Sequence, residues 1–408
     1  MSKKIAVIGG GAAGMMAAIQ AADAGALVDL FERNDRVGKK LLVTGNGKCN
    51  FSNLDMQKNA YYGSAVSLYD DLFPIFGVRE TIAFFNQHGM LTKDRNGYLY
   101  PLSEQASTVL DILRFSLEQY KVSIHTESII TCIRQDEKSK KLQIISPAFK
   151  QTYDAVILAC GGRAAPKTGS DGNGFRLAEN LGHHINTVVP ALVQLRCQEN
   201  FFKMVSGVRI EAKLKLCIDG EEKSSVQGEL QLTDYGISGI PVFQFSRQAA
   251  YALYDKKKVS VIIDFLPHQS AASYEALWKE RWERQGGQTL EQFLTGLSNK
   301  KINQLIIKLA GCSMHDTAEN IPIAKRKTIE RLYRSLTVSI RETNGFEQAQ
   351  VSAGGIPAEE LTKQLESKYI PNLYFAGEMI DMDGICGGYN LQWAWTSGAV
   401  TGRAAAKS

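Results

Sequence analysis

The stretch IAVIGGGAAG, residues 5–14, decides the fold of this chain. Its first four residues form a short apolar run typical of a buried strand, and the Ala- and Met-rich segment 12–24 has helical character. Between them, Gly9 permits a tight turn, Gly11 lets the backbone approach a pyrophosphate, and Gly14 lets helix and strand pack closely. The N-terminus of the helix then faces the phosphate charge. The stretch therefore predicts a dinucleotide-binding turn.

An acidic residue follows at the spacing that such a site requires. The strand-like run 27–32 ends in Glu32, eighteen residues after Gly14, where a carboxylate accepts hydrogen bonds from a ribose 2′-hydroxyl. Gly25 stands just past the helix, where a left-handed cap is expected. Because all these features have the expected spacing, a glycine turn that binds nothing explains them poorly. A carboxylate disfavours a 2′-phosphate, so we expect FAD or NAD and not NADP.

Length and composition indicate which class of protein to expect. With 408 residues, 44% of them hydrophobic and 22% charged, the chain is expected to form two or three globular domains. The formal net charge of +5 is too small to indicate a nucleic-acid partner. The first strand begins at Ile5, which leaves no room for a signal peptide, and no apolar stretch reaches the roughly 18 residues of a membrane span. Seven scattered cysteines without a CxxC pair predict neither a metal site nor a disulfide framework, and fit a cytoplasmic protein.

The pattern of apolar and polar residues changes twice along the chain. Strand and helix patterns alternate at the beginning, apolar and polar residues alternate in 209–216, and a helical pattern extends over about 270–334. We therefore expect an α/β fold in which a Rossmann-like domain is discontinuous and carries an insertion. The expected boundaries are 1–191 with 336–408 for the Rossmann-like domain, 192–269 for an antiparallel β domain and 270–335 for a helical domain.

Three later segments favour FAD over NAD. The loop 44–53 is rich in Gly and Asn, and the apolar strand within 154–162 ends in small residues. Near the other end, the strand within 373–378 is followed by a glycine turn, 384–388, that opens a helix. The positive end of this second helix suits the pyrimidine end of a reduced flavin, which becomes anionic. Two helix N-termini aimed at one ligand fit FAD, whereas a simple NAD dehydrogenase needs only the first.

Together these segments resemble the BaiN/YhiN-type family of FAD-dependent oxidoreductases, flavoproteins with two dinucleotide-binding domains that are related to aminoacetone oxidase. The likeness covers almost the whole chain. Its most specific stretches are 44–53, 168–174, 228–241 and 383–398. The resemblance implies a discontinuous FAD domain interrupted by a β-barrel-like domain and a helical domain.

The resemblance also implies the FAD contacts. These are Gly9, Gly11, Ala12, Ala13, Gly14, Glu32, Arg33, Lys39, Lys40, Gly47, Cys49, Asn50, Ile130, Ala159, Gly161, Gly162, Gly377, Glu378, Gly387, Gly388, Tyr389, Asn390 and Leu391. The sequence departs from the family pattern at Lys48, where Arg is usual, and at Cys160, where Thr is frequent. Lys48 keeps the charge but loses a bidentate contact.

Members of this family reduce carbon–carbon double bonds of steroid-like acids with electrons from NAD(P)H, or oxidise amines and return electrons to dioxygen. No second GxGxxG follows a strand, so we expect NADH or NADPH to bind only transiently, as an electron donor. The predicted function is NAD(P)H-linked reduction of an activated C=C bond in a small organic substrate. A flavin amine oxidase using dioxygen is the alternative, and an RNA-linked flavoprotein is an alternative of another class.

No catalytic residue is assigned from the sequence. Candidate proton donors are Tyr389, Cys49, Tyr235 and Arg247, since reduction of a C=C bond needs a proton. Each has a simpler structural explanation, as a pocket, turn or surface residue. Cys49 and Cys386 lie in two loops expected near the flavin, which raises a thiol-linked reaction as an option, although isolated packing cysteines are commoner.

Overall fold

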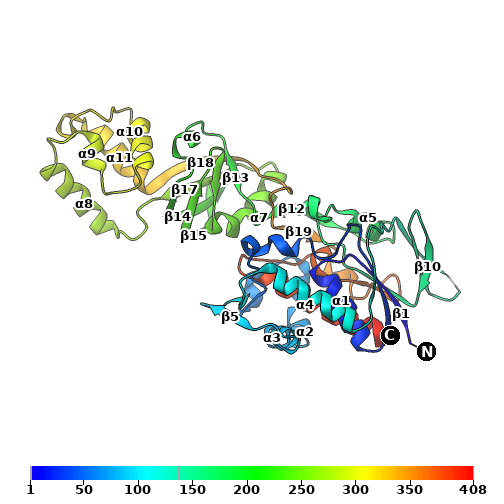
Figure 1. Cartoon of the computed structure of the whole chain (residues 1–408). Coiled ribbons are helices and arrows are strands. Elements are labelled where there is room, and N and C mark those ends of the chain that lie inside the picture. Colours follow the sequence, from blue (N-terminus) through cyan, green and yellow to red (C-terminus); the bar gives the residue numbers. More distant parts are fainter. Residues whose placement is uncertain (1, 137, 408) are drawn as a thin grey trace. The chain divides into compact units, whose positions relative to one another are not determined.

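The structure is a computed structural model that describes residues 2–136 and 138–407. Its contacts divide the chain into two compact units. The first comprises Met1–Pro190 and Phe346–Ser408, and the second Ala191–Gly345. Figure 1 shows the blue beginning and the red end of the chain within the same part of the molecule. The first unit is therefore built from both ends of the sequence.

A five-stranded parallel sheet forms the centre of the first unit, in the order β20-β11-β1-β2-β7. Its strands are β1 (Lys4–Ile8), β2 (Leu27–Phe31), β7 (Ser123–His125), β11 (Ala155–Leu158) and β20 (Leu373–Phe375). Ile5 lies opposite Val28 on one side and Ala155 on the other. All four residues of β11 are buried, as expected for a parallel sheet covered on both faces. These continuous apolar runs explain why the segments form inner strands.

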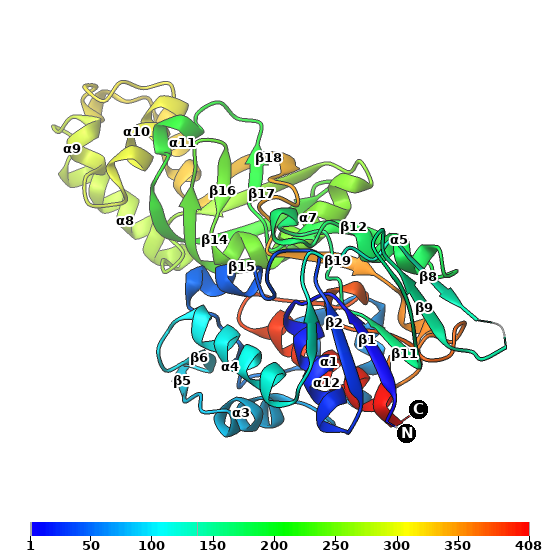
Figure 2. The same ribbon diagram turned by 45° about the vertical axis from the view of Figure 1, so that its right-hand side comes forward.

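Two helices from opposite ends of the sequence pack together on this sheet. They are α1 (Ala12–Asp23) and α12 (Tyr389–Lys407), and Figure 2 shows both beside β1 and β2. A Cβ atom added to Gly398 would lie 2.4 Å from the carbonyl oxygen of Ala13, and one added to Gly402 would lie 2.3 Å from that of Ala17. The two helix backbones are therefore in direct contact. Only glycine permits this approach.

Smaller elements surround the parallel sheet. Three small sheets of the first unit are antiparallel: β3 (Ser52–Asn53), β6 (Tyr98–Pro101) and β5 (Thr92–Arg95); β4 (Tyr61–Tyr62) and β21 (Asp383–Gly384); and β8 (Cys132–Gln135), β9 (Leu142–Ile145) and β10 (Lys150–Tyr153). A further pair consists of β12 (Asn186–Ala191) and β19 (Val351–Gly355). Its other helices are α2 (Tyr69–Leu72), α3 (Val78–Gln87), α4 (Ala106–Gln119) and α5 (Asn173–Glu179).

The second unit contains a closed barrel in the strand order β13-β16-β15-β14-β17-β18. Its strands are β13 (Leu195–Cys197), β14 (Arg209–Ile218), β15 (Glu221–Leu232), β16 (Gly236–Ser238), β17 (Val259–Asp264) and β18 (Leu336–Thr343). Burial alternates along β17 and through most of β14, so one side of these strands faces the interior. The barrel is accompanied by α6 (Phe202–Val205) and α7 (Ile240–Tyr254).

Four further helices complete this unit. They are α8 (Ala271–Arg284), α9 (Leu290–Leu294), α10 (Lys300–Leu309) and α11 (Ile323–Ser335). Trp278 of α8 and Tyr333 of α11 belong to the same buried cluster as Val338 of the barrel. The expected division at residue 270 therefore falls inside a unit with one shared hydrophobic core.

The expected fold class, a Rossmann-like α/β domain with an inserted barrel and helices, is confirmed. The boundary expected at residue 336 coincides with the start of β18, which pairs with β17 and β13 and so belongs to the barrel. The first unit resumes only at Phe346. The helical pattern ends at 335, whereas the barrel still needs its last strand. Among the described residues, no helix has the length and apolar character that crossing a membrane requires.

We predict that Gly402→Ala destabilises the first unit. The added methyl group would lie 2.3 Å from the carbonyl oxygen of Ala17, so α12 must shift. We expect a net loss of up to about 2 kcal/mol in the free energy of unfolding, since an overpacking cost of about 1–3 kcal/mol is offset by the roughly 1 kcal/mol by which Ala favours a helix over Gly. Urea unfolding measures this difference. Gly287→Ala is the control, because its Cβ would meet no heavy atom within 4 Å, and equal stability of the two variants would contradict the prediction.

Candidate dinucleotide site

The first glycine turn connects β1 to α1 under tight steric limits. Gly9 has a φ of +110°, and a Cβ atom there would lie 2.3 Å from the carbonyl oxygen of Ala159 at the end of β11. A Cβ atom on Gly14 would lie 1.8 Å from the carbonyl oxygen of Gly9. Both glycines are thus required by the packing of the turn. The sequence pattern predicted these roles: a tight turn at Gly9 and close packing of helix and strand at Gly14.

Gly11 differs, because its Cβ direction is open. It is the N-cap residue of α1, with no side-chain cap, and no heavy atom lies within 4 Å of its Cβ position. The N–H groups of Ala12, Ala13 and Gly14 have no acceptor within the helix. These donors and the adjacent space form a cradle for an anion, which the positive end of the helix favours. The residues present therefore fit a pyrophosphate.

Glu32 lies at the end of β2, as the spacing predicts, and is 8% exposed. Its Oε2 accepts a hydrogen bond from the N–H of Gly10 at 2.8 Å. Its Oε1 accepts two from Asn34, from the backbone N–H at 2.8 Å and from Nδ2 at 2.7 Å. A carboxylate offers about four acceptor sites, so one remains for a ribose hydroxyl. The neighbouring Arg33 forms an ion pair with Asp171 at 2.5 Å.

A buried hydroxyl that sequence reasoning missed lies beside this end of the sheet. Ser170 is buried, and within the described part of the chain its Oγ has no hydrogen-bond partner. That oxygen lies 2.9 Å from the Cβ position of Gly161. Because buried polar atoms normally have a partner, Ser170 is a further candidate ligand of the cofactor. Its only signal in the sequence is its place in the stretch 168–174. Next to Gly161, the thiol of Cys160 donates to the carbonyl oxygen of Ile8 at 3.4 Å, and burial raises its pKa to about 12.

An ion pair connects a residue from the first part of the sequence with a residue from its last part. Lys40 Nζ lies 2.7 Å from Glu378 Oε2, although 338 positions separate the residues. Glu378 Oε1 accepts a hydrogen bond from the N–H of Ser352 at 2.7 Å. A Cβ atom on Gly162 would lie 2.8 Å from this oxygen. Three predicted site residues, Lys40, Gly162 and Glu378, are thus brought together. Gly377 contacts α1, because its Cβ would lie 2.8 Å from that of Ala13.

The second glycine turn opens α12 and packs against the loop 44–53. Gly387 and Gly388 have φ values of +123° and +92°. A Cβ atom on Gly388 would lie 2.4 Å from the carbonyl oxygen of Ser52 and 2.8 Å from Asn50 Oδ1. Asn53 Nδ2 donates to the carbonyl oxygen of Gly387 at 2.9 Å. The loop and the turn, predicted independently from the sequence, therefore lie side by side.

Asn390 and Tyr389 support this second turn. The side chain of Asn390 accepts from the N–H of Gly384 and donates to its carbonyl oxygen, both at 2.8 Å. The Tyr389 hydroxyl donates to the carbonyl oxygen of Asp55 at 2.8 Å, and the Tyr61 hydroxyl donates to that of Tyr389 at 2.9 Å. Burial raises the pKa of Tyr389. The hydroxyl proton of Tyr389 is therefore already engaged in a structural hydrogen bond.

The two cysteines singled out in the sequence carry neutral thiols. Cys49 is fully buried and has a φ of +55°. Burial raises its pKa to about 12, against which a hydrogen bond from Thr44 acts weakly. Burial also raises the pKa of Cys386 to about 12. Both are free cysteines, and neither has the low pKa of a reactive thiolate.

The remaining predicted residues lie at the edges of these turns. Gly47 has a φ of +82° and an open Cβ direction, and Lys39 pairs with Asp35 at 2.7 Å. The carbonyl oxygen of Ile130 accepts from Asn173 Nδ2 at 3.5 Å. Leu391, in the first turn of α12, packs against the core.

Two other candidate donors, Tyr235 and Arg247, belong to the second unit. The Arg196 guanidinium lies 5.0 Å from the centre of the Tyr235 ring. The Arg247 guanidinium lies 4.9 Å from that of Tyr251. Both residues thus take part in contacts within their own unit.

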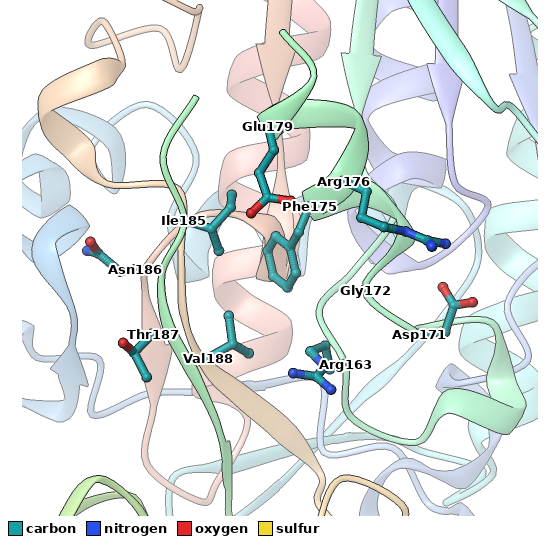
Figure 3. A pocket seen from close by; sticks show the side chains of 10 residues that line it. All are labelled: Arg163, Asp171, Gly172, Phe175, Arg176, Glu179, Ile185, Asn186, Thr187 and Val188. Atoms are coloured by element: carbon teal, nitrogen blue, oxygen red, sulfur yellow. The ribbon is translucent and has the colours of Figure 1, made fainter. Parts of the chain in front are cut away.

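A pocket of about 450 Å³ lies close to the loop that follows Gly162 (Figure 3). Phe175, Ile185 and Val188 supply apolar walls, and Figure 3 shows Arg163, Arg176, Asp171 and Glu179 around them. The Arg163 guanidinium lies 4.4 Å from the centre of the Phe346 ring. With two charges of each sign, this pocket favours no particular ionic ligand.

The chain is similar to known proteins along almost its whole length. A family model described as HI0933-like protein Rossmann domain matches residues 3–404. The chain is 40% identical over 407 residues to the 3-dehydro-bile acid delta(4,6)-reductase of Clostridium scindens, covering 99% of both chains. It is 27% identical over 398 residues to the ribosomal RNA dihydrouridine synthase of Haemophilus influenzae, covering 96% of this chain and 95% of that protein.

Solved structures show the same fold. The 3-ketosteroid-delta4-(5alpha)-dehydrogenase of Rhodococcus jostii has a TM-score of 0.51 and 16% identity, with 100% of this chain and 97% of that chain covered. At this identity the likeness concerns the fold alone. The resemblance inferred from the sequence is confirmed by the family match. The chain belongs to the family of HI0933-like proteins with a Rossmann domain, and it is an FAD-dependent oxidoreductase.

Proposed function

We propose that FAD lies along the two glycine turns, with its pyrophosphate at the N-terminus of α1 and its flavin ring at the N-terminus of α12. The observation that carries this assignment is the uncapped start of α1, with open space beyond Gly11. Glu32 would accept a ribose hydroxyl through its remaining acceptor site. Lys40 and Glu378, paired at 2.7 Å, would lie along the part of the cofactor between its pyrophosphate and its flavin ring. We place the other predicted FAD contacts along the same path, between the first glycine turn and the second.

We further propose that the chain reduces a carbon–carbon double bond conjugated to a carbonyl group. The relative with 40% identity is named as a reductase of such a substrate, and a dihydrouridine synthase also saturates a double bond of this kind. Bound FAD supplies the hydride chemistry for this reaction. The N–H groups at the start of α12 would stabilise negative charge near them. Tyr389 and Cys49, both buried and both with raised pKa values, would keep water away from that end.

NADH or NADPH is the proposed electron donor, because a reductase needs a source of hydride. The described residues contain one glycine turn of the pyrophosphate-binding kind, at Gly9–Gly14, and FAD is assigned to it. The nicotinamide would therefore bind briefly and leave before the substrate enters. In the amine oxidase alternative, the amine itself would reduce the flavin and dioxygen would accept the electrons.

A ribosomal RNA substrate is the second candidate, favoured by the relative with 27% identity. Two arginines of the helical part are engaged by the protein itself. Arg281 donates to the carbonyl oxygen of Phe293 at 2.7 Å, and Arg326 donates to those of Ile321 and Glu319 at 2.8 and 2.7 Å. Both guanidinium groups already donate to backbone carbonyl oxygens at helix and loop ends, so these two arginines do not form an open face for RNA phosphates.

We predict that Gly11→Val weakens FAD binding and leaves the fold intact. The backbone at Gly11 is extended, with a φ of −82°, and its Cβ direction is open, so Val fits there but fills the space proposed for the pyrophosphate. The N-cap change costs at most about 1 kcal/mol of stability. The dissociation constant for FAD, measured by titration of the apoprotein, should rise at least about tenfold. Gly287→Val, at another open position, should not change it, and unchanged affinity of Gly11→Val would contradict the proposed path.

The reaction is tested with reduced enzyme in the absence of oxygen. We expect a 3-keto bile acid with a conjugated double bond to reoxidise the flavin rapidly and to gain two hydrogens, as seen by absorbance and mass spectrometry. The saturated ketone is the control and should leave the flavin reduced. NADH or NADPH should bleach the oxidised enzyme. Bleaching by an amine but by neither nicotinamide would show an oxidase, and reoxidation by uridine-containing RNA alone would favour the second candidate.

The thiol-linked option makes a separate prediction. At pH 8 a thiol with a pKa of about 12 is ionised in about one molecule in ten thousand. We therefore expect Cys49 and Cys386 to resist alkylation in the folded protein and to remain reduced after air oxidation. Peptide mass spectrometry without reductant measures both. A disulfide between the two cysteines would revive the thiol-linked reaction.

A further inference from the structure

The three-stranded sheet β3-β6-β5 presents a distinctive outer face. Its pairing register places Arg95 opposite Tyr98, Lys93 opposite Tyr100, and Asn53 opposite Tyr98 on the other side. Paired residues lie on the same face of a sheet, and alternate residues lie on opposite faces. Leu99 is buried in the core. The tyrosines and the cations therefore share the outer face.

This face borders the two loops that carry the proposed flavin end. The Tyr98 ring lies against the second glycine turn, because its Cε1 is 2.7 Å from the Cβ position of Gly387. The Tyr100 ring lies near the loop 44–53, with its Cε1 4.0 Å from the Cβ position of Gly45. Tyr98 and Tyr100 thus lie on one face of the sheet beside both loops, and this face is called the aromatic wall below.

Much of the wall is accessible to solvent. Tyr98 is 42% exposed, and Leu91 and Leu102, joined by a backbone hydrogen bond of 2.8 Å, are 65% and 55% exposed. Adjacent exposed apolar side chains of this kind commonly mark a binding surface.

Three cations at the edge of the wall share one carboxylate. Lys93 and Arg95 both donate to Glu104 Oε1, and Lys48 Nζ lies 3.7 Å from Glu104 Oε2. These hydrogen bonds lower the pKa of Glu104 to about 2, so the carboxylate is charged at neutral pH. The cluster still has two positive charges in excess. An ammonium group has three N–H donors and a guanidinium five, so one carboxylate cannot satisfy them all.

We propose that this face is the substrate-binding wall of the enzyme. Tyr98 and Tyr100 pack against the flat ring system of a conjugated ketone, and Arg95 and Lys93 bind a carboxylate at the far end of the same molecule. The excess positive charge beside an exposed aromatic surface selects an anionic, amphipathic ligand. Arg95 is held in place by Tyr100, since its guanidinium lies 5.7 Å from the centre of that ring. This inference rests on the proposed reduction of a conjugated double bond.

Equilibrium binding to the oxidised, FAD-loaded protein tests the wall without turnover. The probes are a 3-keto bile acid with a conjugated double bond and its methyl ester, which lacks the negative charge. Binding is followed by the change in the flavin spectrum and by calorimetry. The wild-type protein should bind the acid about tenfold more tightly than the ester, and added salt should reduce only the affinity for the acid.

Variants separate the two parts of the wall. Lys93→Gln with Arg95→Gln should reduce the affinity for the acid about tenfold and leave the ester unchanged, while Arg95→Lys should retain much of the preference. Tyr98→Ala should weaken both ligands. Arg79→Gln is the matched control, because Arg79 is an exposed cation that pairs only with Glu80 on α3 among the described residues, and it should change neither.

Two results would overturn the inference and leave the proposed reaction standing. One is equal affinity of acid and ester for the wild-type protein, and the other is unchanged binding of both ligands by the Tyr98 and cation variants, provided that these keep their FAD and their melting temperature. Tight, charge-dependent binding of the acid without reoxidation of the reduced flavin would instead contradict the proposed reaction and retain the anionic subsite.

Discussion

The direct contact between the backbones of α1 and α12 is the constraint on which the rest of the first unit depends. α1 begins at the first glycine turn, and α12 begins at the second, 377 positions later. Because Gly398 and Gly402 let the two helices touch, both helix N-termini are fixed within one small unit. This arrangement suits a cofactor such as FAD, in which a pyrophosphate and a flavin ring are held a fixed distance apart in one molecule.

The same constraint explains where the insertion lies. The parallel sheet is complete only when β20 pairs with β11, and β20 comes directly before the second turn. The chain therefore leaves the first unit after Pro190 and must return at Phe346. Between these points it forms a closed barrel, which has no unpaired edge. Such an insert is stabilised by a hydrophobic core of its own.

The parts of the site that could be predicted from the sequence are those fixed by local spacing. Gly9, Gly14 and Glu32 stand at distances set by one strand, one turn and one helix, so their roles follow from the pattern alone. The Lys40–Glu378 pair and the position of Tyr98 against Gly387 depend on tertiary packing of distant segments. The buried hydroxyl of Ser170 was missed for the same reason. The sequence shows which residues are present, but it does not show which distant residues they contact.

Burial also decides which groups at the flavin end can move a proton. Burial raises the pKa values of Cys49, of Tyr389 and of the half-buried Cys386, and the Tyr389 hydroxyl already donates to a backbone carbonyl. These groups are neutral at physiological pH, so in the proposed site the helix N-terminus would be the group that stabilises negative charge. A proton donor for repeated turnover must instead exchange with solvent. Cys49 and Tyr389 do not meet this requirement, so under the proposed reaction the donor must come from an exposed part of the site.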